Sequence, residues 1–188
     1  MQRDAPQEST FAKLARTRRT IHRFSSEAVP FDAIEAAVHL AHFAPCHHRT
    51  WPWRFTYVGG ERRKSLNTLS RQHKGAGLSG DALKIFEEKL IHPELVVISQ
   101  RRAGDPVRAR EDYAAIACAV QNMSLALHER EIGLKWSTGK LTRSPVAYEL
   151  LSIDESLEEI VGFLWIGYPA QTPQVARPPV EEVFRQLS

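Results

Sequence analysis

The segment 111–130 restricts the fold more than any other part of this sequence, because apolar residues recur along it at helical spacing. One face carries Tyr113, Ile116, Ala117, Val120, Met123, Ser124 and Leu127, and the arc is widened by Ala114, Ala115, Cys118 and Ala119. A helix that is apolar over most of its circumference is buried, either in a domain centre or in a subunit interface. The segment therefore predicts a long central helix.

The composition is that of a globular protein with one sizeable core. The chain has 188 residues, of which 43% are hydrophobic and 25% charged, and we expect a single domain over residues 1–188. Its 25 Lys and Arg residues against 22 acidic ones give a net charge of +3. This excess is too small for a nucleic-acid footprint, so we expect no nucleic-acid partner.

Cysteine use and hydropathy bear on the setting of the protein. Only two cysteines occur, at Cys46 and Cys118, without metal or disulfide spacing, which favours a reducing, cytoplasmic location. The first thirty residues carry charges throughout, and no apolar run approaches the ~20 residues that span a bilayer. We therefore expect no membrane partner.

The remaining patterns predict an α+β chain in which helices separate the strands. Strands are expected at 53–58, 94–99, 134–136 and 160–166, and the run at 94–99 is apolar enough to be buried on both faces. Helices are expected at 7–17, from Phe31 to Pro45, and at 61–73, 81–91, 145–152 and 180–187.

Two apparent motifs fail in their context. Gly75-x-Gly77-x-x-Gly80 matches the dinucleotide fingerprint, but a polar, helical segment precedes it where a strand is required, so we interpret it as a flexible linker. Four histidines lie near residue 45, namely His39, His42, His47 and His48. No carboxylate or thiolate pattern completes a metal site around them, so no metal is expected.

The chain shows no acid–base pair or nucleophile of its own. Cys118 falls inside the apolar helix, where a thiol behaves as a small hydrophobe, and no nucleophile elbow is present. If the protein is an enzyme, a bound cofactor should supply the chemistry. Trp53 and Trp165 have strand contexts typical of core residues, whereas Trp51 and Trp136 adjoin polar clusters and could flank a planar ring.

A basic segment, Arg18-Arg19-Thr20-Ile21-His22-Arg23, follows the first predicted helix. It fits a solvated helix end favoured by the helix dipole, and it equally fits a phosphate site, since guanidinium groups and a hydroxyl bind phosphate well.

Four segments in order resemble the FMN-dependent nitroreductase family: RRT at 18–20, APCHH with PWRF at 44–55, KWSTG at 135–139 and VGFLWIGYP at 161–169. The resemblance extends from about Leu14 to Phe184 and is strongest for the short members of the family. It implies a central, mostly antiparallel sheet flanked by helices, in a homodimer with FMN at the subunit interface.

The resemblance also implies roles for particular residues. Arg18, Arg19 and Thr20 would hold the ribityl phosphate, and Arg177 in the C-terminal tail would close on it. Residues from the end of the second helix would reach the flavin of the partner subunit, and the Trp-Ser-Thr-Gly turn would lie against the cofactor. These implied contacts are Phe43, Pro45, His47, Trp136, Ser137, Thr138 and Gly139.

The chain departs from the family pattern at two positions. His22 stands where many members have Lys or Arg at the flavin pyrimidine edge, which bears on redox tuning. Trp51 replaces a common Gln before the Pro-Trp pair, which bears on the shape of the substrate cleft.

The sequence thus predicts an oxidoreductase that transfers a hydride from NADH or NADPH, through FMN, to a small electron-poor acceptor such as a nitroaromatic or a quinone. Two alternatives remain open. One is a specialised enzyme of the same superfamily, such as a dehalogenase, a dehydrogenase or a flavin-consuming enzyme. The other is a non-catalytic flavin-binding or storage protein.

Overall fold

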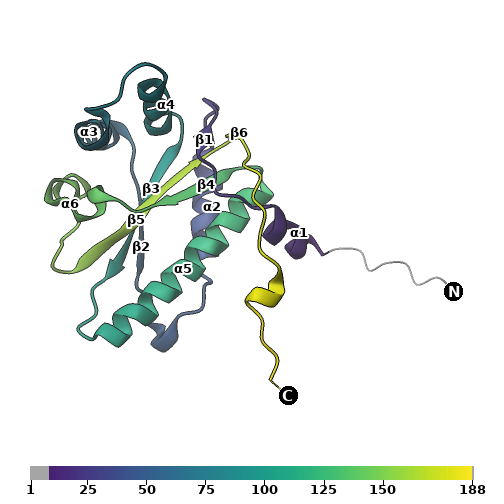
Figure 1. Cartoon of the computed structure of the whole chain (residues 1–188). Helices are drawn as coiled ribbons and strands as arrows, with labels where there is room; N and C mark the ends of the chain where they lie inside the picture. The colour runs from purple at the N-terminus through teal and green to yellow at the C-terminus, as the bar shows by residue number, and fades with distance from the viewer. Residues whose placement is uncertain (1–8, 188) are drawn as a thin grey trace.

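A four-stranded antiparallel sheet forms the centre of the computed structural model, which describes residues 9–187 (Figure 1). The strand order is β2 (Trp53–Tyr57), β3 (Glu94–Arg101), β5 (Glu158–Gly167) and β4 (Gly133–Ser137). Residues 95–100 of β3 are buried, as their continuous apolar run predicts. The α+β class and the antiparallel sheet expected from the sequence are confirmed.

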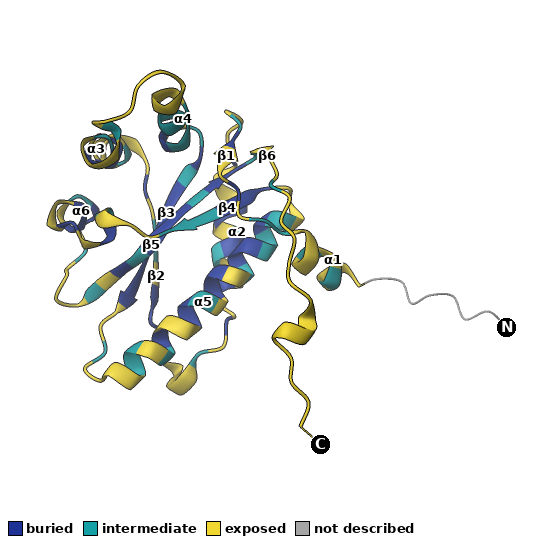
Figure 2. Cartoon of the chain, viewed as in Figure 1, coloured by how far each residue is buried: buried dark blue, intermediate teal, exposed yellow. Residues whose placement is uncertain are grey.

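Two helices cover one face of the sheet, α2 (Phe31–Ala41) and α5 (Pro106–Glu129). Figure 2 shows their sheet-facing sides as buried. Their buried apolar residues pack with those of the strands; on α5 these are Ala115, Ile116, Ala119, Val120, Met123 and Leu127. The helix begins five residues before the expected start at 111, because Asp105 caps it by accepting from the amides of Val107 and Arg108.

The apolar arc of α5 is only partly inside the core. Ala114 and Cys118 are exposed, so the Cys118 thiol does not lie in the core of the chain, and burial in a subunit interface stays a prediction. Tyr113 on the same helix and Leu40 on α2 are also largely exposed. None of the described helices has both the length and the apolar character to cross a membrane.

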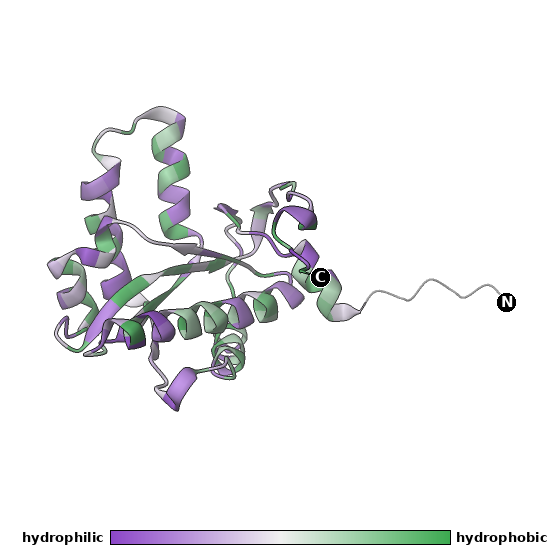
Figure 3. Cartoon of the chain, turned by 60° about the horizontal axis from the view of Figure 1, so that its bottom comes forward, coloured by the Kyte–Doolittle hydropathy of each residue, from purple (hydrophilic) through white to green (hydrophobic). Residues whose placement is uncertain are grey.

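A second helical layer, α3 (Gly60–Ser70), α4 (Gly80–Ile91) and α6 (Pro145–Leu151), lies on the other face. Figure 3 shows α3 and α4 standing side by side and projecting from the body of the molecule. They are joined by a π-helical turn, Arg71–Gly75, and a short loop. The Gly75-x-Gly77-x-x-Gly80 string belongs to this helix–helix connection, with no strand before it, which confirms that it is a linker.

The N-terminal helix lies near the C-terminal end of α5, whereas the C-terminal tail runs away from the body of the molecule (Figure 1). Helix α1 (Thr10–Thr17) is joined to α5 by a 2.8 Å hydrogen bond between Thr17 Oγ1 and His128 Nε2. Ser9 caps α1, so the helix is shorter than the expected 7–17, of which residues 7 and 8 lie outside the described part.

Short strands β1 (Arg23–Phe24) and β6 (Pro169–Gln171) pair with each other, and the tail runs on from β6. The helix expected at 180–187 is wrong: only a 3₁₀ turn forms, at Val180–Glu182. The apolar side chains of this tail are exposed, with Leu187 at 95%. They bury no surface that could offset the entropy of ordering a short helix.

Candidate functional site

The basic segment after α1 runs beside the edge strand β4. Thr20 forms a parallel bridge with Leu134, and the Ile21 amide donates to the Leu134 carbonyl at 3.3 Å. A Cβ on Gly133 would stand 2.3 Å from Ile21 Cγ1, so glycine is required for this close approach. The packing fixes the arginines and the imidazole of the segment along the strand.

On one side of β4 the arginines line a cleft of about 320 Å³, here called the arginine cleft. Its lining comprises Thr17, Arg18, Arg19, Ile21, Ser124, His128, Glu131, Ile132, Gly133, Leu134, Pro169 and Thr172. Arg19 Nη1 donates to the carbonyls of Arg16 at 2.5 Å and Arg18 at 2.9 Å. Arg19 therefore also caps the C-terminal end of α1.

Arg18 is the more available of the two guanidinium groups. It is half-buried, and burial lowers its pKa, as do the positive charges of Arg177 and Arg19. Arg177, in the C-terminal tail, is therefore close enough to Arg18 for its charge to act on the Arg18 guanidinium. Within residues 9–187 neither Arg18 nor Arg19 is in an ion pair with a carboxylate, which leaves a concentrated positive charge at the cleft.

On the other side of β4 lies a cavity of about 230 Å³, here called the lysine cavity. It brings together His22 and the predicted turn residues Ser137, Thr138 and Gly139. Four lysines that the sequence reasoning missed also line it: Lys74 from the π-helical turn, Lys89 from α4, Lys135 from β4, and Lys140 just after the turn. They come from separate parts of the chain, and no motif links them.

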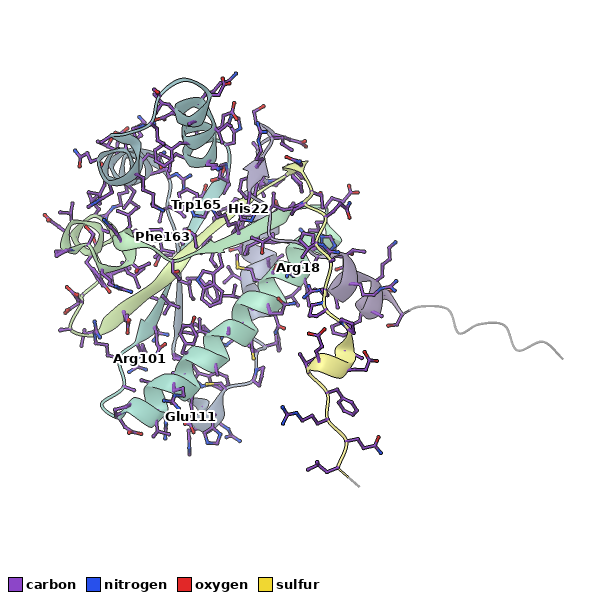
Figure 4. The ribbon with its side chains drawn as sticks, in the orientation of Figure 1. Arg18, His22, Arg101, Glu111, Phe163 and Trp165 are labelled. Carbon is purple, nitrogen blue, oxygen red and sulfur yellow. The ribbon has the colours of Figure 1, made fainter. Side chains whose placement is uncertain are left out.

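Ser137 is held by an aromatic neighbour on β5. The indole N–H of Trp165 donates to Ser137 Oγ at 2.8 Å, and this hydroxyl lies 3.4 Å from the carbonyl of Phe163. Trp165 packs against the core, as its strand context predicts, but it is only partly buried and also lines the cavity. In Figure 4 the labelled His22, Phe163 and Trp165 lie close together.

The imidazole of His22 is surrounded by positive charge. Partial burial lowers its pKa, and the charges of Lys135 and Lys89 lower it further. Because an unperturbed imidazole titrates near ~6.5, the lowered pKa leaves His22 neutral at pH 7.

Trp136 does not line the lysine cavity, unlike its neighbour Ser137. Successive side chains of a strand point to opposite faces, and Trp136 packs with the core on the α5 side, its ring centroid 6.2 Å from that of Tyr113. Its indole Nε1 is buried without a hydrogen-bond partner and lies against Gly162. A Cβ at Gly162 would stand only 2.1 Å from that nitrogen.

The predicted residues that follow α2 lie elsewhere on the chain. His47 Nε2 is 3.7 Å from Glu111 Oε1 near the start of α5, and Phe43 is 81% exposed; Pro45 lies between them. Figure 4 shows Glu111 and Arg18 far apart, at opposite ends of α5. The helix has 24 residues and is therefore about 36 Å long. One chain alone does not join these residues to the arginine cleft.

Glu111 also supplies a carboxylate that the spacing of the histidines does not reveal. The potential ligand atoms of His47, His48 and Glu111 all lie within 4.8 Å of one another. Glu111 is shared with Arg108, whose Nε is 3.5 Å away. Trp51, next in this loop, packs its ring 5.9 Å from that of Trp53 and does not contact Trp136.

Comparisons with known proteins identify the family and the fold of the chain. A relative from Bacillus subtilis, YfhC, provisionally named an NAD(P)H nitroreductase, is 30% identical over 189 residues, covering 96% of each chain. The crystal structure of a nitroreductase-like family protein from Bacillus cereus is 26% identical and matches with a TM-score of 0.81, covering 97% of this chain and 98% of that one. A provisionally assigned nitroreductase from Desulfovibrio desulfuricans, solved in complex with FMN, shares the fold with a TM-score of 0.77 at 22% identity, over 97% and 99% of the two chains.

The family model described as the nitroreductase family matches residues 15–168. That range contains the basic segment, β4 with its Ser-Thr-Gly turn, and the strand that holds Trp165. The chain belongs to the nitroreductase family.

Proposed function

We propose that the protein is an FMN-dependent oxidoreductase that takes a hydride from NADH or NADPH and reduces a nitroaromatic or quinone acceptor. One observation carries the proposal: two arginines that form no ion pair within residues 9–187 lie on one side of β4, and Ser137, His22 and Lys135 lie on the other. The name of the Bacillus subtilis relative and the FMN complex of the Desulfovibrio desulfuricans protein support it.

The arginine cleft fits the phosphate of FMN. Arg18 is half-buried and not ion-paired within residues 9–187, and the charge of Arg177 reaches it. Guanidinium groups donate two parallel, charge-assisted hydrogen bonds to phosphate oxygens. We assign Arg18, Arg19, Thr20 and Arg177 to this phosphate, with Arg18 as the principal contact because Arg19 also caps α1.

The lysine cavity fits the edge of the flavin ring. When bound, FMN supplies the hydride chemistry, which no side chain of this protein can perform. Ser137 and the backbone of Thr138 and Gly139 offer hydrogen-bonding groups, while His22 and Lys135 place a donor and a positive charge where the ring gains electrons. Such groups favour reduction, because they stabilise developing negative charge.

We propose that the site is completed by a second copy of the chain. Phe43, Pro45 and His47 cannot reach the arginine cleft within one chain, and Leu40, Phe43 and Tyr113 leave apolar surface exposed on the α2 and α5 side. A homodimer formed on that side would cover this surface and bring the loop after α2 to the partner's cleft.

The proposal is tested by the spectrum of the purified protein before and after anaerobic addition of NADH or NADPH. We expect about one FMN per chain, held by charged contacts worth ~1.5–3 kcal/mol each, and bleaching of its visible absorbance by at least one nicotinamide. Recovery of the absorbance on adding a quinone or a nitroaromatic would complete the cycle. A protein that binds added FMN but is reduced by neither nicotinamide would support a flavin-storage role instead.

A further inference from the structure

The lysine cavity carries more positive charge than its own surroundings balance. Its lining includes Lys74, Lys89, Lys135 and Lys140 together with His22 and His73, and no aspartate or glutamate. Within residues 9–187, no carboxylate pairs with Lys74, Lys89 or Lys135.

The two acidic residues that precede Lys89 in the sequence are engaged by arginines. Glu87 is bound by Arg71, whose Nε donates to it at 2.7 Å. Glu88 lies 3.9 Å from Nη2 of Arg23. Glu87 and Glu88 are thus used by other cations, and Lys89 remains without a carboxylate partner among the described residues.

The electrostatic repulsion among these lysines acts on the ammonium group of Lys135. Burial lowers the pKa of its ammonium group, and the charges of Lys89 and Lys74 lower it further. Unbalanced like charges around a cavity are unfavourable until an anion enters, and such clusters are found at ligand sites.

Lys74 stands beside the Ser-Thr-Gly turn but comes from a different layer of the fold. It comes from the π-helical turn between α3 and α4, and its Nζ lies 3.7 Å from where a Cβ on Gly139 would stand. Its side chain is exposed, so the ammonium group can be reached from solution while it overhangs the Ser-Thr-Gly turn.

Apolar side chains complete the lining and favour a flat, apolar body next to the charge. These are Phe24, Phe86, Leu90, Leu141, Phe163 and Trp165. A small cavity with aromatic walls and a few polar groups at one side selects an aromatic ligand and orients it.

We propose that the lysine cavity binds an electron acceptor that carries a carboxylate on its aromatic ring, and that Lys74 is the residue that holds the carboxylate. This inference rests on the proposed function, because it specifies the acceptor class of the same site. Lys74 is a specificity-determining residue here, while His22 and Ser137 serve the flavin.

The test compares 4-nitrobenzoate with its neutral isostere 4-nitrobenzamide on the FMN-loaded protein. Lys74→Gln should lower kcat/KM for 4-nitrobenzoate about tenfold, mainly through KM, as expected for the loss of one charged hydrogen bond. The value for 4-nitrobenzamide should stay within about twofold, since an amide offers no charge to Lys74. The matched control is Lys84→Gln on α4, an exposed lysine outside the cavity, which should leave both values unchanged.

A binding measurement gives a readout that does not depend on turnover. Isothermal titration of the oxidised protein should show tighter binding of 4-nitrobenzoate than of 4-nitrobenzamide, and Lys74→Gln should abolish the difference. An equal loss for both ligands in Lys74→Gln, or no preference in the unsubstituted protein, would overturn the inference.

Two further measurements on Lys74→Gln show whether Lys74 binds a ligand other than the acceptor. If Lys74→Gln weakens FMN binding, Lys74 is a flavin contact and the inference is wrong. If Lys74→Gln instead weakens the binding of NADH or NADPH in the reductive half-reaction and leaves the acceptor preference intact, the anion that Lys74 binds is a dinucleotide phosphate. That result would also overturn the inference. Failure of the proposed function looks different, because the unsubstituted protein would then not be reduced by either nicotinamide.

Discussion

The indole of Trp165 on β5 donates to the hydroxyl of Ser137 at the end of β4, at 2.8 Å. One face of that indole is covered by Arg63, whose guanidinium carbon is 4.8 Å from the ring centroid. Arg63 in turn donates from Nη2 to the carbonyls of Leu90 and Pro93. The Ser-Thr-Gly turn is therefore oriented by a chain of contacts that reaches α3 and α4.

Replacing Trp165 with Phe should remove this hydrogen bond and weaken FMN binding, because Ser137 loses its fixed orientation. A double-mutant cycle with Ser137→Ala isolates the effect, with the FMN dissociation constant as the measurement. We expect a coupling of about 1 kcal/mol between the two positions. Strict additivity would show that Trp165 contributes packing alone.

The two arginines of the basic segment should respond differently to alanine. Arg18→Ala should weaken FMN binding by about 1.5–3 kcal/mol with little change in Tm, since its charge serves the cleft. Arg19→Ala should lower the Tm of the protein as well, because Arg19 Nη1 satisfies two carbonyls at the end of α1.

Fluorescence titration of FMN and thermal unfolding together separate these outcomes, and Lys13→Ala on the exposed side of α1 is the control. Unchanged FMN affinity in a folded Arg18→Ala protein would show that the basic segment is only a solvated helix end.

The pH response of His22 should lie on the acidic side of neutrality. The sequence alone favours a response in the neutral range, but burial, followed by the charges of Lys135 and Lys89, lowers the imidazole pKa. His22 is then neutral at pH 7 and gains charge only as the pH falls below its ordinary value of ~6.5. A lowered folded-state pKa means that the stability contributed by the neutral ring is present above ~6.5 and is lost as the pH falls through the folded pKa.

Anaerobic stopped-flow reduction by NADH or NADPH from acidic to neutral pH tests this. The rate should rise in the wild type as the pH falls below ~6.5, because a cation then faces the reduced ring. His22→Gln should flatten the profile, and His22→Lys should keep reduction fast at neutral pH. Identical profiles for all three proteins would exclude a role for His22.

Gly162 should not accept a side chain. An alanine Cβ would stand 2.1 Å from Trp136 Nε1 and 3.1 Å from the Ser137 carbonyl oxygen, which forces Trp136 to move. Overpacking of this kind costs about 1–3 kcal/mol and should lower the Tm of the FMN-loaded protein. Gly104→Ala is the control, because a Cβ at that position would meet no atom within 4 Å; equal Tm values in the two variants would contradict the prediction.

Most of the fold can be predicted from the sequence because its elements have strong local signals. The strands expected at 94–99 and 160–166 and the helix expected at 145–152 lie within about two residues of their true bounds, which is the usual accuracy of such boundaries. The predicted start of α5 is wrong although Asp105 and Pro106 form a clear cap signal. The exposed tail differs for another reason, since its helical pattern has no surface to pack against.

The site is predictable only where a motif marks it. Arg18, His22 and the Ser-Thr-Gly turn belong to such motifs, and the structure places them along β4. Lys74, Lys89 and Lys135 have no local signal, because their common position depends on how the α3–α4 pair folds over the sheet. Trp136 lies on the opposite face of β4 from Ser137, since neighbouring side chains in a strand face opposite ways, and its contact with the cofactor stays a prediction.

The length of α5 has a genetic consequence. If Arg18 of one subunit and His47 of the other contact the same flavin, each site is assembled from two polypeptides. A substitution at either position then impairs a site to which both subunits contribute. At an FMN concentration too low to load Arg18→Ala or His47→Ala alone, co-expression of the two variants should therefore restore activity, because the mixed dimer contains one site with both native residues. Its other site carries both substitutions, so the mixed dimer should reach about half of the wild-type activity, by simple counting of intact sites.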